Sequence, residues 1–239
     1  MNLKKLEHAA IKAAQKAGSF LIKEKHKQKV VASSKGRDIK LKLDIDTEKI
    51  IRKELLGTNI PILGEELGME KESDLMWVID PIDGTANYFR GLDQCCVSIA
   101  LIDKKDALIG VILNFNTQET YSAVKGKGAY LNGKEIKVSN ISKKEKATLT
   151  TGFPASETLE SSMIFLEDLK EWKKIRMFGS AALSCAYVAS GKCDFYAEKG
   201  VYLWDFAAGI CLVKEAGGNV KYEAIDNERY SVKFSNNLL

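Results

Sequence analysis

The stretch "MWVIDPIDGTANYF", residues 76–89, runs from an apolar strand into an acidic turn. Pro81 fixes the backbone direction, so that Asp80 and Asp83 can be aimed at one point with little loss of chain entropy on binding. Gly84 permits close approach of a ligand to the backbone, and the amides at the start of the short helical segment that follows attract phosphate. Taken alone, the stretch also fits a strand-to-helix turn with a capping aspartate.

Two further acidic segments favour the interpretation that residues 80–85 belong to a binding site. "ILGEELG" (62–68) places Glu65 and Glu66 directly after a short apolar strand and a glycine. "YLWDFAAGICLVKEAGG" (202–218) places Asp205 at the N-terminal edge of a helix that a glycine pair ends. By themselves, Asp205 also fits a helix cap and the two glutamates a solvated turn.

The types of side chain in these segments indicate a hard divalent cation. Carboxylates and backbone oxygens suit Mg²⁺, whereas zinc sites are built from His and Cys. The chain has two histidines, His8 and His26, both in its N-terminal region. Carboxylates brought together without a cation would repel one another and raise their pKa values, and a bound metal ion would remove that repulsion.

Composition indicates a soluble globular protein. The chain has 239 residues, of which 45% are hydrophobic and 28% charged, enough for a sizeable core. Its net charge of +4 is small, and the basic segments 23–29 and 143–146 lack interleaved aromatic residues, so nucleic acid is not favoured as a partner. Five cysteines without CxxC spacing predict free thiols in a reducing compartment. No signal peptide and no apolar run long enough to span a membrane is found, which favours the cytoplasm.

Residues 1–146 are predicted to form an α+β domain that carries most of the candidate metal ligands. Apolar residues at helical spacing predict a helix over 3–25, and a second helix is predicted over 46–57, with a breaker-rich loop at 33–38 between them. A series of strands follows, separated by turn signals typical of an antiparallel meander. The predicted strands are 60–64, 76–80, 95–102, 107–115, 120–126 and 129–138.

Residues 147–239 are predicted to form an α/β domain, because short apolar segments alternate there with helical ones. The predicted strands are 147–153, 174–178, 193–198, 219–224 and 230–235. The predicted helices are 157–171, 180–191 and 204–218.

Three of these segments closely resemble the signatures of one family. "GEE" (64–66), "WVIDPIDGTANYF" (77–89) and "WDFAAGICLVKEAGG" (204–218) are similar to those of the inositol monophosphatase family, lithium-sensitive and magnesium-dependent phosphomonoesterases. "KGRD" (35–38) and "FGSAALSCAYVASG" (178–191) extend the resemblance over nearly the whole chain. The resemblance implies a layered α-β-α-β-α sandwich with an antiparallel N-terminal sheet and a mixed C-terminal sheet.

The resemblance also implies a metal site with two to three Mg²⁺ ions, for which Mn²⁺ could substitute. The implied ligands are Glu65, Asp80, the carbonyl of Ile82, Asp83 and Asp205. The Lys35-Gly36 loop resembles a flap associated with a third, weaker metal site.

Asp44 and Thr85 match the pair that orients and deprotonates the attacking water. The sequence departs from the family pattern before Asp44, where it reads Asp38-Ile39-Lys40-Leu41, so Asp44 is chosen by its spacing to Glu48 and Ile51 and Asp46 remains the alternative.

Substrate contacts are implied in the same way. The amides of Gly84 and Thr85 match those that contact phosphate, and Glu198 matches the residue that holds a substrate hydroxyl. Gly179, Ser180 and Ala181 match the segment near the sugar ring. Arg176 could attract a second phosphate or be a surface arginine at a strand start.

The expected function is therefore Mg²⁺-dependent hydrolysis of a small phosphate monoester, with inositol monophosphate as the first candidate. Fructose 1,6-bisphosphate and the nucleotide 3'-phosphates of the PAP and NADP type are the alternatives within the superfamily. A non-catalytic regulatory module is the alternative outside enzymes. A homodimer is expected from the resemblance, with the meander and Trp172 as the candidate interface.

Overall fold

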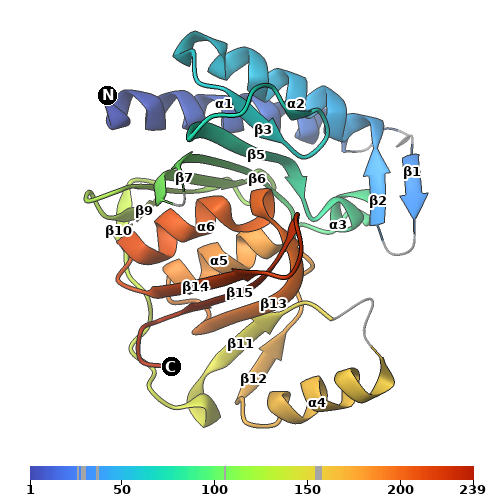
Figure 1. Ribbon diagram of the computed structural model, residues 1–239, viewed down its shortest axis with the longest axis vertical. Helices are drawn as coiled ribbons and strands as arrows, with labels where there is room; N and C mark the ends of the chain where they lie inside the picture. The colour runs from blue at the N-terminus through green and yellow to red at the C-terminus, as the bar shows by residue number, and fades with distance from the viewer. Residues whose placement is uncertain (26, 28–30, 36–37, 105, 154–157) are drawn as a thin grey trace.

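The computed structural model describes residues 1–25, 27, 31–35, 38–104, 106–153 and 158–239. Five layers follow one another, helix pair, sheet, helix pair, sheet and helix, so that the predicted α-β-α-β-α sandwich is confirmed (Figure 1). Within the described residues, no helix combines the length and the apolar character that crossing a membrane requires.

The outer helix pair is α1 (Leu3–Glu24) and α2 (Lys42–Leu55). The predicted stripe of α1 is buried, including Ala10, Ala17 and Leu21. Helix α2 begins four residues before the predicted start at Asp46, so that Asp44 lies in its first turn and not in the preceding loop.

The larger sheet has eight strands in the order β10-β9-β8-β7-β6-β5-β3-β4. Its strands are β3 (Ile62–Gly64), β4 (Gly68–Met69), β5 (Leu75–Asp83), β6 (Cys96–Asp103), β7 (Asp106–Asn114), β8 (Glu119–Val124), β9 (Ala129–Leu131) and β10 (Lys134–Ile136). The predicted antiparallel meander is confirmed for every neighbouring pair except β3 and β5, which are parallel. That exception has a consequence for the site, because it places the residues after β3 beside the end of β5.

The smaller sheet is mixed, as predicted. Its order is β12-β11-β13-β15-β14, with β11 parallel to both β12 and β13 and the remaining pairs antiparallel. Its strands are β11 (Thr148–Thr151), β12 (Lys174–Arg176), β13 (Phe195–Tyr202), β14 (Asn219–Ala224) and β15 (Arg229–Ser235). Helix α4 (Leu159–Leu169) lies at the far side of this sheet (Figure 1).

Helices α5 (Ala181–Ala189) and α6 (Leu203–Glu215) form the middle layer between the two sheets. One hydrophobic cluster runs from Val78 and Ala100 of the larger sheet through both helices to Tyr196 and Phe234 of the smaller one. Apolar packing is therefore continuous across the predicted division at residue 146, and the assignment of two domains stays a prediction.

Short elements complete the chain. Residues 33–35 and 38 of the predicted breaker-rich loop lie instead in an antiparallel strand pair, β1 (Val31–Lys35) and β2 (Asp38–Leu41). Gly36 of the predicted flap lies outside the described residues. The remaining elements are α3 (Thr85–Arg90) and the 3₁₀ turns Leu56–Thr58 and Lys144–Lys146.

Candidate active site

A β-bulge at the end of β5 brings Asp80 and Asp83 to the same face of the sheet. In a regular strand, residues three apart point to opposite faces. Here Asp80 pairs with Ser98 and Asp83 with Cys96, so that three steps along β5 match two steps along β6. The extra residue falls in the stretch that contains Pro81, which has no N–H to give to the ladder. The bulge at Pro81 therefore directs the carboxylates of Asp80 and Asp83 to the same side of the sheet.

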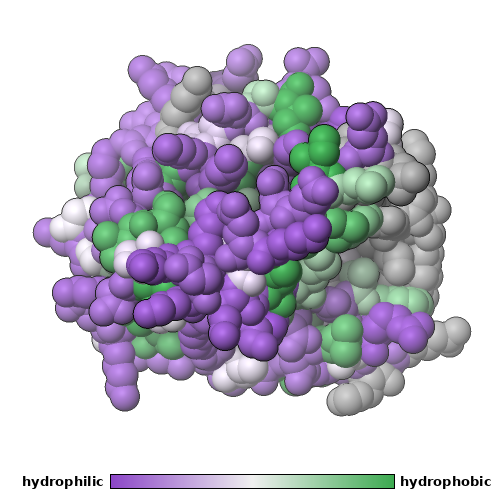
Figure 2. Space-filling view, turned by 90° about the horizontal axis from the view of Figure 1, so that it is seen from below, coloured by the Kyte–Doolittle hydropathy of each residue, from purple (hydrophilic) through white to green (hydrophobic). Residues whose placement is uncertain are grey.

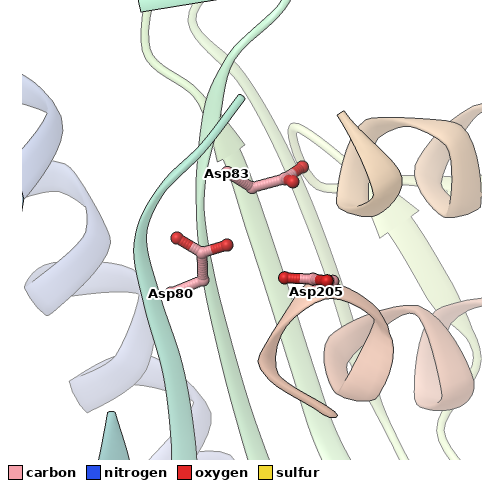
Figure 3. A group of neighbouring side chains, drawn as sticks. All are labelled: Asp80, Asp83 and Asp205. Carbon is pink, nitrogen blue, oxygen red and sulfur yellow. The ribbon is translucent and has the colours of Figure 1, made fainter. Parts of the chain in front are cut away.

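Asp205 completes the cluster from the other half of the chain. It lies in the first turn of α6, where its Oδ2 accepts a hydrogen bond of 2.7 Å from the backbone N–H of Tyr202. Oxygen atoms of Asp80, Asp83 and Asp205 all lie within 4.8 Å of one another. Figure 3 shows the three side chains pointing toward one another from the end of β5 and the start of α6.

The N-terminus of α5 holds Asp83. The Ser180 hydroxyl, the N–H of Ala182 (2.9 Å) and the thiol of Cys96 (3.5 Å) donate to its Oδ2, and the N–H of Ala181 donates to Oδ1 (3.2 Å). Ser180 and Ala181 were predicted near a sugar ring, and the structure gives them a contact with this carboxylate. A serine directly before an apolar helical run is a helix-cap signal, so the sequence carried a hint of this arrangement.

The electrostatics of the cluster favour a cation. Burial raises the pKa of Asp80 well above its usual value, and the charges of Glu65, Asp83, Asp205 and Asp44 raise it further. Burial and then the charge of Asp83 do the same to the pKa of Asp205. Burial also raises the pKa of Asp83, although its four hydrogen bonds oppose the rise.

No Lys or Arg in the described parts of the chain forms an ion pair with any of these three aspartates. Buried like charges without a protein counter-ion are costly, whereas an oxygen-only donor set of this kind suits a hard divalent cation. The residues present therefore fit a metal ion.

Glu65 approaches the cluster because β3 runs parallel to β5. Gly64 pairs with Ile79, so the next residue on each strand is Glu65 on one and Asp80 on the other. The charge of Glu65 is the largest one acting on the pKa of Asp80. Glu66, its neighbour, donates its N–H away from the cluster to Glu48 (2.8 Å).

Asp44 and not Asp46 faces the cluster. Asp44 is buried, and its charge contributes to the raised pKa of Asp80. The Asp46 carboxylate is 40% exposed and lies 3.6 Å from the Lys49 ammonium on the outer side of α2. The spacing that favoured Asp44 is explained by a helix face, since Asp44, Glu48 and Ile51 are all buried.

The phosphate-contact residues predicted at the start of α3 lie next to the predicted sugar-ring segment. Gly84 has φ of 88°, and a Cβ placed there would lie 2.7 Å from the carbonyl oxygen of Gln94 and 3.1 Å from that of Gly179. The Thr85 hydroxyl donates to the carbonyl of Ile82 (2.8 Å), which is the predicted backbone metal ligand. Gly84 and Gly179 are therefore in close backbone contact beside Asp83.

The side chain of Asn87 joins these two segments. The Asn87 amide donates to the carbonyls of Gln94 and Phe178 at 2.7 Å each. It thereby links α3 to the chain that leads into α5.

Glu198 and Arg176 have different surroundings. Burial raises the pKa of Glu198 to about 7, although a hydrogen bond of 3.0 Å from the Tyr196 hydroxyl opposes the rise, and the charge of Asp83 adds to it. The effect of Asp83 indicates that Glu198 lies near the cluster. The Arg176 side chain is exposed and donates to the carbonyl of Ile175 (2.9 Å), and no hydrogen bond or ion pair among the described residues joins it to the carboxylates.

Comparison with known proteins identifies the family of the chain. A relative from Xylella fastidiosa named "Nus factor SuhB" is 40% identical over 217 residues, which cover 88% of this chain and 79% of that protein. A relative from Thermotoga maritima named "Fructose-1,6-bisphosphatase/inositol-1-monophosphatase" is 35% identical over 215 residues, 88% of this chain and 82% of that protein. The solved inositol monophosphatase from Anabaena superposes with a TM-score of 0.87 at 32% identity, covering 100% of this chain and 93% of that one. The sequence pattern of the "Inositol monophosphatase family" matches residues 2–227, and the chain belongs to that family.

Proposed function

We propose that this protein is a metal-dependent phosphatase that hydrolyses small phosphate monoesters. The observation that carries the proposal is the convergence of Asp80, Asp83 and Asp205, from two distant parts of the chain, to within 4.8 Å. Membership of the inositol monophosphatase family supports phosphatase activity over other functions that a cluster of three aspartates could have.

The proposed metal site takes two to three Mg²⁺ ions, with Mn²⁺ as a substitute. Its proposed ligands are Glu65, Asp80, the carbonyl of Ile82, Asp83 and Asp205. When bound, the ions would lower the pKa of water and offset negative charge on the phosphate. The hydrogen bonds from α5 fix the Asp83 carboxylate before any cation binds, which reduces the ordering needed on binding.

Asp44 and Thr85 are the proposed pair for the attacking water. The Thr85 hydroxyl already donates to the Ile82 carbonyl, which leaves its oxygen lone pairs to accept a hydrogen bond from the attacking water and orient it. Asp44 is the proposed final proton acceptor. The amides of Gly84 and Thr85 would hold the phosphate at the start of α3.

Inositol monophosphate is the substrate we propose first. An ionised Glu198 can accept hydrogen bonds from adjacent ring hydroxyls, and Gly179 lies against Gly84 near the proposed phosphate position. Fructose 1,6-bisphosphate is the nearest alternative, supported by the name of the Thermotoga maritima relative. In that alternative Arg176 would attract the second phosphate. Nucleotides of the PAP and NADP type, which carry a 3'- and a 2'-phosphate respectively, are a further alternative.

A second role, as a regulatory partner, is suggested by relatives named "Nus factor SuhB". Such a role does not need the carboxylate cluster, so it is compatible with catalysis and separable from it by assay.

A cytoplasmic homodimer is also proposed, with an interface that differs from the one expected from sequence. The meander strands are covered by helices on both faces, and Trp172 packs on Phe195 of its own chain with ring centroids 5.1 Å apart. Exposed apolar side chains gather instead around α4 and β12, at the end of the molecule seen in Figure 2, where hydrophobic patches interrupt a mainly hydrophilic surface. They are Phe153, Met163, Ile164, Leu166 and Met177.

Phosphate release with and without EDTA tests the proposed function. The substrates are myo-inositol 1-phosphate, fructose 1,6-bisphosphate, adenosine 3',5'-bisphosphate and NADP, each with Mg²⁺, and Asp80→Asn is the matched variant. We expect release from myo-inositol 1-phosphate that EDTA abolishes, excess Mg²⁺ restores and Asp80→Asn lacks. No release from any of the four would refute the proposal, and wild-type activity in Asp80→Asn would refute the ligand assignment.

A further inference from the structure

Glu48 is a fully buried carboxylate outside the aspartate cluster. It lies on α2 and its side chain is 0% exposed. Its Oε1 accepts from the Arg52 Nε (2.8 Å) and from the N–H of Leu67 (3.2 Å), and its Oε2 accepts from the N–H of Glu66 (2.8 Å). Both carboxylate oxygens are thus occupied by donors from α2 and from the segment after β3.

The backbone of segment 64–68 packs closely against the Glu48 carboxylate. A Cβ at position 64 would lie 2.1 Å from Glu48 Oε1, so that only glycine allows the backbone to approach so closely. Arg52 reaches the other end of the segment, where its guanidinium donates to the carbonyl of Gly68 (2.7 Å) and to Glu70 (2.7 Å). One ion pair therefore holds both ends of the segment that carries Glu65.

Glu65 is fixed between two anchors. Its own N–H donates to the carbonyl of Ile79 (3.3 Å), the residue directly before Asp80, and the next N–H along the chain donates to Glu48. The two bonds set the backbone at Glu65 relative to both β5 and α2. Because the position of a carboxylate determines how strongly it binds a metal ion, hydrogen bonds that fix the backbone at Glu65 affect the affinity for the metal.

The same helix face carries Asp44. Asp44 and Glu48 are four residues apart on α2, and both are buried. A residue that anchors the Glu65 segment to α2 therefore also sets the distance between the proposed metal ligand Glu65 and the proposed proton acceptor Asp44.

We propose that Glu48, held by Arg52, is a positioning residue that places Glu65 for metal binding. The inference rests on the proposed function, because it assumes that Glu65 is a metal ligand. A structural role alone would make Glu48 important for stability and leave the metal affinity of the folded protein unchanged.

Mn²⁺ binding tests the inference without relying on activity. Mn²⁺ is titrated into the metal-free protein, and free Mn²⁺ is followed by electron paramagnetic resonance for the wild type, Glu48→Gln and Arg52→Gln. Folding of each variant is checked by circular dichroism and by cooperative thermal unfolding. In Glu48→Gln an NH2 group, which cannot accept a hydrogen bond, replaces one carboxylate oxygen, so at least one of the three donors loses its acceptor. We expect the Mn²⁺ dissociation constant of this variant to rise roughly tenfold or more.

Arg52→Gln separates positioning from net charge. Loss of a cation near the site strengthens cation binding if charge alone matters, whereas the proposed role predicts weaker binding. Should Arg52→Gln fail to fold, Arg52→Lys keeps the charge but not the forked geometry, and it is also expected to weaken binding. Glu54→Gln is the control: Glu54 lies on the same helix and pairs with Lys16 (2.5 Å), and its loss should leave Mn²⁺ affinity unchanged.

Weaker binding in Glu48→Gln and in the Arg52 variant, with Glu54→Gln like the wild type, would support the inference. Wild-type affinity in Glu48→Gln, or tighter binding in Arg52→Gln, would overturn it alone. A wild-type protein that binds no Mn²⁺ would overturn the proposed metal site together with this inference.

Discussion

Asp80→Asn should stabilise the metal-free protein. Unit charges with oxygens within 4.8 Å repel by about 3.5 kcal/mol or more at an effective dielectric constant of about 20. Because the carboxyls relieve part of this repulsion by binding protons, we expect removal of one charge to add about 2–3 kcal/mol to the free energy of unfolding at pH 8. Asparagine keeps an oxygen for the backbone N–H of Ile82, which donates to Asp80 Oδ1 (2.9 Å), so that bond need not be lost.

The pH dependence of this gain follows from the direction of the pKa shift. The pKa of folded Asp80 lies well above the usual value of 3.8, so the folded state holds its proton when the unfolded state has released it. Stability of the wild type is therefore lost as pH rises from the unfolded pKa through the folded one. The gain from Asp80→Asn should be close to zero at pH 4 and reach its full size at pH 8.

Thermal unfolding in EDTA measures the effect. For a chain of this size the gain corresponds to a rise in Tm of roughly 4–12 °C at pH 8. Asp74→Asn is the matched control, because the Asp74 side chain is 73% exposed and its Tm change should be small. With Mg²⁺ at about 100 times its Kd, the wild type should gain about 2.7 kcal/mol and Asp80→Asn much less, so that their difference in Tm shrinks or reverses.

Two results would refute the reasoning. A metal-free Asp80→Asn protein with a Tm equal to or below that of the wild type at pH 8 would show that the cluster is not under electrostatic strain. An equal Mg²⁺-dependent rise in both proteins would show that Asp80 is not a metal ligand.

The other predictions concern catalysis and assembly. Thr85→Ala should lower kcat in the phosphate-release assay by roughly a hundredfold, with a smaller effect on KM, since it acts on the attacking water; a change confined to KM would contradict that role. Because the pKa of Glu198 is about 7, its carboxylate becomes ionised as pH rises from 6 to 8, and KM for myo-inositol 1-phosphate should fall by roughly tenfold over that range. Glu198→Gln should flatten this pH profile of KM; an unaltered profile in the variant would assign the titration to another group. Ile164→Glu should convert the proposed dimer to a monomer in light scattering, whereas Leu56→Glu, at an exposed position outside α4 and β12, should not.

Much of the fold could be predicted because its signals are local. Apolar residues at helical spacing predicted α1 and α6 to within a few residues, and turn signals separated the meander strands. The buried face of α2 explains why spacing alone favoured Asp44 over Asp46. The start of α2 was placed too late because the helix begins at Lys42, before both of the aspartates that could have marked its start.

The site was only partly predictable, because its decisive contacts join residues far apart in sequence. The bulge between Asp80 and Asp83 depends on the register of β6. The donors to Asp83 come from α5, nearly a hundred residues later, and were assigned by resemblance to a different role. Glu48 was used only as a spacing mark, since nothing local shows that the segment after β3 folds around it.

The number of backbone donors distinguishes the three aspartates of the cluster. Asp83 accepts hydrogen bonds from four groups, including two backbone amides at the N-terminus of α5, and its pKa is raised least of the three. Asp80 and Asp205 each accept from one backbone N–H, and their pKa values are raised well above the usual range. Helix N-termini thus compensate part of the negative charge without adding a cation that would compete with the metal. Asp80 lies within β5 and receives no hydrogen bond from a helix N-terminus, so its charge depends most on a bound ion. Substitution at Asp80 therefore tests metal binding more directly than substitution at Asp83, which would also uncap α5.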